Sequence, residues 1–181
     1  MPEIRVEYQE ELGALEASAL GGLDLVTSQL VRTLEAVEHQ DIELAQIVVA
    51  DDDRIDGRYL EVHQALITLL ATQSPVATDL RPISALLHVL KNVERMGDQC
   101  VNICKMIPLT GNEPPSDQEM VKLILSMGGQ TKTLLSQAKR AFADRDIELA
   151  QDLVRNSQPL NQFGGEIFAA DTGRVSNRLC L

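Results

Sequence analysis

Two pairs of carboxylates are the residues of this sequence best placed to do chemistry. Asp52 and Asp56 are four residues apart, and so are Glu94 and Asp98. On a helix this spacing puts both members of a pair on one face, where like charges cost roughly 0.2–0.5 kcal/mol per pair unless a cation neutralises them. If the two helices are antiparallel neighbours, the four carboxylates face one another, which suits Mg, Mn, Fe or Zn ions. A metal site at these four residues is therefore one interpretation of the spacing.

A second interpretation of the same residues is a solvated acidic face. Acidic pairs at this spacing are common on protein surfaces, and the run Asp51-Asp52-Asp53 is typical of a segment that faces water. Gly97 lies between Glu94 and Asp98, and its missing side chain would let an ion or a second helix approach closely. The spacing alone leaves both interpretations open.

Other chemistry finds little support in the sequence. None of His39, His63 and His88 follows a glutamate by three positions, which argues against a ferritin-like di-iron oxidase. His63 lies two turns after Asp56, so it is either an added ligand or a packed or surface histidine. The sequence contains no phosphate-binding glycine loop, no dinucleotide fingerprint and no Gly-x-Ser-x-Gly. No positive sign of an enzyme therefore remains.

The cysteines do not form a disulfide framework. Their number is odd, and no Cys-x-x-Cys occurs among Cys100, Cys104 and Cys180. The spacing of Cys100 and Cys104 predicts two small buried residues on one helix.

The composition favours a helical, water-soluble protein that avoids polyanions. Of 181 residues, 44% are hydrophobic and only 3% aromatic, too few aromatics for a typical sandwich or barrel. The 16 basic and 27 acidic residues leave a net charge of −11, which argues against nucleic-acid binding and against direct binding to anionic membranes. The N-terminus lacks a signal-peptide pattern and no apolar run reaches about 18 residues, so we expect a cytoplasmic protein.

Apolar residues at helical spacing predict five helices. The first ends near His39, and the second begins at the N-cap Asp41 and continues unbroken to Ser74-Pro75. The third carries Pro82, which we expect in its first turn. A linker follows over residues 108–115. A capping box that starts at Ser116 opens the fourth helix, and the fifth begins near residue 146.

An internal repeat organises these helices. The hexapeptide Asp-Ile-Glu-Leu-Ala-Gln occurs at residues 41–46 and again at 146–151, an offset of 105. The repeat predicts an all-α fold of tandem antiparallel three-helix bundles, with a first unit over residues 6–107 and a partial second unit over 116–181. We expect the second unit to hold two helices and an irregular tail, because periodicity fades over residues 164–181.

Two segments resemble the PhoU family. Residues 69–81 (LLATQSPVATDLR) are similar to its inter-helix turn, and residues 94–103 (ERMGDQCVNI) are similar to its E-R-[IM]-G-D-x-x-V-N-I signature. Asp52-x-x-x-Asp56 and Glu94-x-x-x-Asp98 then resemble two copies of the acidic motif of the family. The resemblance covers most of residues 6–163.

The resemblance implies two three-helix bundles, metal clusters on the acidic motifs and no catalysis. It implies a regulator that couples a phosphate ABC transporter to its sensor histidine kinase and represses the phosphate-starvation response and phosphate uptake, meeting the membrane only through these partners. Asp52, Asp56, Glu94 and Asp98 are the ligands carried over. At the repeat offset Ser157 and Asn161 replace the two aspartates of the first motif, so a second metal site is not expected.

Two further expectations complete the sequence-based hypothesis. The fourth and fifth helices carry an apolar surface that a missing third helix would cover. Exposing about 400 Å² of such surface forgoes roughly 10 kcal/mol, so we expect a homodimer through the second halves. The alternative function is a generic cytoplasmic helical adaptor with no metal role, and a metal-dependent oxidoreductase ranks third.

Overall fold

The computed structural model describes residues 2–73, 77–111, 115, 117–158 and 160. Within these residues every regular element is a helix, which confirms the all-α fold class. The elements are α1 (Pro2–His39), α2 (Ile42–Ala50), α3 (Asp53–Gln73), α4 (Ala77–Met106), the 3-10 turn η1 (Ile107–Thr110) and α5 (Gln118–Ala143), and a last helix covers residues 147–158. None of the helices in the described part of the chain is long and apolar enough to cross a membrane.

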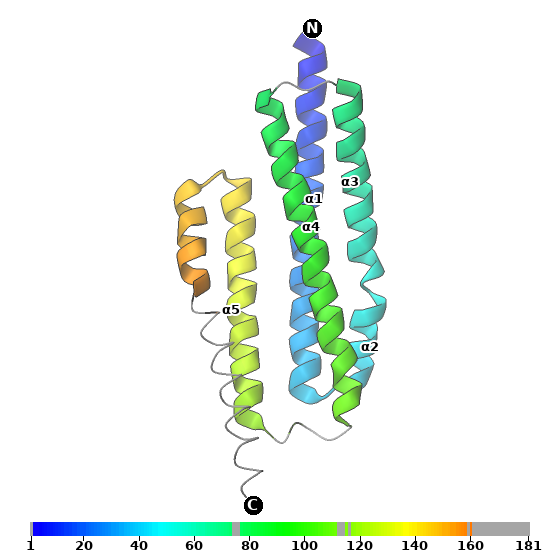
Figure 1. Cartoon of the computed structure of the whole chain (residues 1–181), viewed down its shortest axis with the longest axis vertical. Helices are drawn as coiled ribbons and strands as arrows, with labels where there is room; N and C mark the ends of the chain where they lie inside the picture. Colours follow the sequence, from blue (N-terminus) through cyan, green and yellow to red (C-terminus); the bar gives the residue numbers. More distant parts are fainter. Residues whose placement is uncertain (1, 74–76, 112–114, 116, 159, 161–181) are drawn as a thin grey trace, which may run out of the picture.

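The first unit is an up-and-down bundle with three antiparallel segments: α1, the pair α2 and α3, and α4. Figure 1 shows the chain descending along α1, returning through α2 and α3, and descending again along α4. The apolar stripes predicted from the sequence face one another between these segments. The largest cluster of buried side chains joins α1, α3 and α4 and includes Leu12, Leu66, Leu69, Ile83, Leu86 and Leu90.

The second unit packs against α1 of the first unit. α5 packs along α1, and its Gly128 lies so close to Leu34 that a β-carbon there would overlap the leucine side chain. Two ion pairs cross the same boundary: Lys139 with Asp24 at 2.6 Å and Arg145 with Glu16 at 2.5 Å. The helix of residues 147–158 lies beside α5 (Figure 1), and its side chains share a groove with side chains of α1 and α4.

The two copies of the hexapeptide form the same turn. Asp41 and Asp146 each accept a hydrogen bond from the backbone N–H three residues later, at 2.9 Å in both places. The residue before each aspartate adopts a left-handed conformation, with φ 53° at Gln40 and 55° at Arg145. The offset of 105 therefore relates two equivalent backbone turns, each of which opens a helix with an N-cap aspartate.

Three details of the predicted helices were wrong. The second helix is not continuous, because a turn at Asp51 and Asp52 separates α2 from α3. Pro82 lies in the second turn of α4, since that helix already begins at Ala77. The N-cap of α5 is Asp117, which accepts a hydrogen bond from the N–H of Met120 at 3.0 Å, one residue after the predicted start of the capping box. The predicted tail over residues 164–181 lies outside the described residues.

Candidate metal centre

Asp52 occupies the turn between α2 and α3, and the turn aims its side chain toward α1. The backbone carbonyl of Asp52 accepts hydrogen bonds from the N–H groups of Ile55 at 2.8 Å and Asp56 at 3.1 Å, which starts α3. Its carboxylate does not cap that helix. Instead, Oδ1 of Asp52 accepts a hydrogen bond of 2.9 Å from Nε2 of Gln29 on α1.

Gly97 on α4 lies directly against the side chains of Asp52 and Gln29. A β-carbon at Gly97 would lie 3.0 Å from Oδ1 of Asp52, 3.3 Å from Oε1 of Gln29 and 3.2 Å from the side chain of Ile55. Such contacts are tighter than ordinary van der Waals separation, so the absence of a side chain at this position admits both polar groups. Three elements therefore meet here: α1, the α2–α3 turn and α4.

Asp56 and Asp98 add negative charge at the same place. Both side chains are exposed, Asp56 on α3 and Asp98 on α4. Partial burial raises the pKa of Asp56, and the neighbouring charges of Asp52, Asp98 and Asp53 raise it further. Three of the four predicted ligands, Asp52, Asp56 and Asp98, are thus close enough for their charges to interact. Glu94 is half-buried and lies one helical turn before Asp98 on α4.

Asp51 has a different partner from Asp52. Nη1 of Arg32 on α1 lies 2.5 Å from Oδ2 of Asp51. This hydrogen bond, together with the positive charge of Arg32 and of Arg54, keeps the pKa of Asp51 below its usual value despite some desolvation. Asp51 is therefore neutralised by arginine, which leaves Asp52 to face Gly97.

The donor set fits a hard cation in type, although its side chains do not surround one common point. Across the residues that the structure describes, no three acidic, histidine or cysteine side chains converge as metal ligands. Exposed side chains such as Asp56 and Asp98 change rotamer within nanoseconds, so they are free to turn toward Asp52. All the available donors are oxygen atoms, which magnesium and manganese ions prefer.

His63, Cys100 and Cys104 pack against neighbouring side chains in the structure. His63 is half-buried and its ring lies 5.5 Å from that of Tyr59, centroid to centroid. Cys100 and Cys104 are free and buried, as predicted. Burial raises the pKa of both thiols, although a hydrogen bond with Thr33 opposes that effect. Neutral buried thiols are poor metal ligands.

Gln29 is the residue of this centre that the acidic motifs did not indicate. It stands on the buried stripe of α1, three residues after Val26, and its exposure is only 1%. A polar residue within an apolar stripe is the signal that would have identified it, because buried polar groups need partners.

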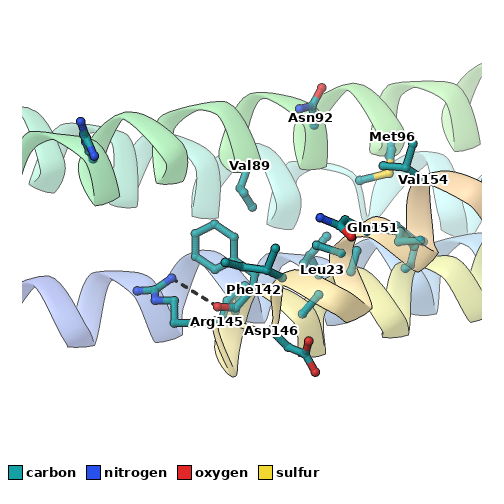
Figure 2. A pocket seen from close by; sticks show the side chains of 17 residues that line it. Leu23, Val89, Asn92, Met96, Phe142, Arg145, Asp146, Gln151 and Val154 are labelled. Carbon is teal, nitrogen blue, oxygen red and sulfur yellow. Dashed lines mark hydrogen bonds between the residues drawn. The ribbon is translucent and has the colours of Figure 1, made fainter.

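A second feature is an apolar groove between the two units. It encloses about 1140 Å³ and is lined by side chains from α1, α4, α5 and residues 147–158. Figure 2 shows Val89 and Met96 of α4, Phe142 of α5 and Val154 of the last helix among the side chains that line it. Ile147 and Val154 are 72% and 67% exposed, so the last helix carries uncovered apolar surface.

Comparison with known proteins identifies the class of this helical protein. The PhoU domain family matches residues 23–107, which contain the α2–α3 turn and both acidic motifs. The "Phosphate-specific transport system accessory protein PhoU homolog" of Caulobacter vibrioides (strain NA1000 / CB15N) is 31% identical over 164 residues, covering 89% of this chain and 70% of that protein. The homolog of the same description from Clostridium acetobutylicum is 29% identical over 162 residues, covering 89% of this chain and 73% of that protein.

Solved structures share the fold. The crystal structure of PhoU from Pseudomonas aeruginosa superimposes with a TM-score of 0.87 at 22% identity, covering 94% of this chain and 81% of that one. The phosphate transport system regulatory protein PhoU from Streptococcus pneumoniae gives 0.84 at 23% identity, covering 94% and 79%. The chain belongs to the PhoU family.

Proposed function

We propose that this protein is a non-enzymatic accessory regulator of phosphate transport. It would couple a phosphate ABC transporter to its sensor histidine kinase in the cytoplasm and repress the phosphate-starvation response and phosphate uptake when phosphate is plentiful. The observation that carries the proposal is family membership, because the relatives in Caulobacter and Clostridium are described as accessory proteins of the phosphate-specific transport system.

A metal ion at the acidic centre is part of this proposal. Asp52, Asp56, Glu94 and Asp98 would hold a divalent or ferric ion (Fe, Mn, Zn or Mg). The ion would supply positive charge that joins the α2–α3 turn to α4. The support is the cluster of negative charge at Asp56 and the missing side chain at Gly97, which lets the oxygens of Asp52 and Gln29 approach α4. Without a cation these like charges repel one another.

Complementation tests the regulatory role. In a bacterium that lacks its own PhoU, expression of this chain should restore repression of a phosphate-starvation reporter at high phosphate. A chain carrying Asp56→Ala and Asp98→Ala is the matched variant for the metal role. Full derepression with soluble, abundant wild-type protein would contradict the proposed regulation.

The alternative function is a helical adaptor with a solvated acidic face. The exposure of Asp56 and Asp98, and the separation of the acidic side chains within the described residues, favour this alternative. Metal analysis of the purified protein separates the two. Stoichiometric metal that Asp56→Ala and Glu94→Ala remove supports the metal role, whereas equal metal content in wild type and variants supports the adaptor.

A further inference from the structure

We propose that Gln29 is a ligand residue of the acidic centre: its side-chain carbonyl oxygen binds the cation, while its amide group holds Asp52 in place. The inference rests on the metal role proposed above and adds a neutral ligand from α1 to carboxylates from the α2–α3 turn, α3 and α4. The chemical class of ligand is a hard divalent cation, for which carboxamide oxygens are suitable donors.

The two ends of the Gln29 amide have different surroundings. Nε2 donates its 2.9 Å hydrogen bond to Oδ1 of Asp52, whereas Oε1 accepts no hydrogen bond from any described residue. The residue is 1% exposed, so bulk water does not solvate this oxygen. A buried acceptor without a partner is costly, and native proteins rarely keep one without a reason such as an ion.

Oε1 of Gln29 is directed toward the acidic centre, so the missing partner of this oxygen would lie there. Oε1 of Gln29 and Oδ1 of Asp52 lie 3.3 Å and 3.0 Å from the position that a β-carbon on Gly97 would occupy. The two oxygens therefore lie over the same small space. A cation in that space would bring together the unpartnered carbonyl and the carboxylate that the same glutamine positions.

Thr33 shows what a merely structural polar residue looks like on this face of α1. It is fully buried one turn after Gln29, but its hydroxyl donates to the backbone carbonyl of Gln29 at 2.9 Å and contacts Sγ of Cys104 at 3.6 Å. The hydroxyl is thus satisfied within the protein. Thr33→Val is accordingly the matched control, because it removes a buried polar group from the same helix without touching the acidic centre.

Calorimetric titration of the whole chain with Mn²⁺ tests the inference. Gln29→Leu should weaken Mn²⁺ binding at least about tenfold, as loss of a group that ligates or orients ligands does. Its unfolding temperature in EDTA should stay equal to that of the wild type or rise, because the unpartnered oxygen is gone. Thr33→Val should keep the wild-type affinity for Mn²⁺.

Gln29→Glu keeps a ligand oxygen and tests the proposal even if Gln29→Leu folds poorly. A second charge beside Asp52 should lower the unfolding temperature in EDTA, and Mn²⁺ should raise that temperature by more than it does in the wild type. Wild-type affinity in Gln29→Leu, together with loss of binding in Asp52→Asn, would overturn the role of Gln29 alone. Absence of Mn²⁺ binding to the wild type would overturn the metal role as well.

Discussion

The side chain of Leu34 on α1 occupies the space that a β-carbon on Gly128 of α5 would need. Gly128 is buried, whereas its neighbour Gly129 is exposed and has no atom within 4 Å of the corresponding position. The two consecutive glycines therefore have separate roles. One permits close packing of the second unit on α1, and the other faces solvent.

Alanine substitutions at the two glycines should change stability in opposite directions. Both variants gain about 1 kcal/mol of helix propensity. Gly128→Ala also forces Leu34 or α5 to move, and overpacking of this kind costs about 1–3 kcal/mol. We therefore expect the free energy of unfolding of Gly128→Ala to be about 1–3 kcal/mol below that of Gly129→Ala, and its urea midpoint to be correspondingly lower. Equal midpoints for the two variants would show that α5 does not press on α1 at this point.

Gly97→Ala should weaken metal binding with little loss of helix. Its β-carbon would displace Oδ1 of Asp52 and Oε1 of Gln29, so we expect about a tenfold loss of Mn²⁺ affinity in a calorimetric titration. Gly57→Ala on α3 is the control, since a β-carbon there meets no atom within 4 Å. A wild-type affinity in Gly97→Ala would argue that the cation does not bind over α4.

Asp56→Asn should stabilise the metal-free protein at neutral pH. The pKa of Asp56 is raised in the folded state by burial and by its acidic neighbours, so its ionised form opposes folding. The gain in stability should be under about 1 kcal/mol, because solvent screens an exposed charge. It should be present above the raised pKa and disappear below the unfolded-state value of about 3.9, where both states are protonated.

Thermal unfolding in EDTA at pH 7 and pH 3.5 measures this effect. Glu61→Gln, an exposed acid on the same helix, is the control for a general change in net charge. If Asp56→Asn and Glu61→Gln raise the unfolding temperature equally, the local repulsion at the acidic centre is not responsible.

The uncovered apolar surface of the last helix should support self-association. We expect sedimentation of the wild type at micromolar concentration to give a dimer, and a chain carrying Ile147→Glu and Val154→Glu to give a monomer. Both side chains are mostly exposed, so helicity should persist in the variant. Leu109→Glu is the control, because Leu109 is 83% exposed but lies in η1. A monomeric wild type would contradict the predicted homodimer.

The helix positions could be predicted from the sequence wherever a cap and an apolar stripe agree. Asp41 and Asp146 open helices as expected, because each aspartate stands directly before residues at helical spacing. The break at Asp51 and Asp52 was missed, because a run of acids looks the same on a solvated helix as in a turn. Its cause is tertiary: Arg32 and Gln29 of α1 each hold one of the two aspartates.

The candidate site could be predicted only in part for a related reason. Each acidic pair can be recognised in the sequence from its four-residue spacing. The contact between the helices that carry the two pairs, α3 and α4, is expected in an antiparallel bundle. Gln29 lies 23 residues before Asp52, and no local pattern connects them. Only packing of α1 against the α2–α3 turn brings the amide to the carboxylate.

The position of α1 has a consequence for how the molecule unfolds. This helix has 38 residues, about 57 Å of rise, and it packs against α2, α3 and α4 on one side and against α5 on another. Loss of α1 would strip the buried faces of both units at once, so neither half retains a complete core without it. The described helices are therefore expected to melt in one cooperative transition, with the amide protons in the middle of α1 among the last to exchange with solvent.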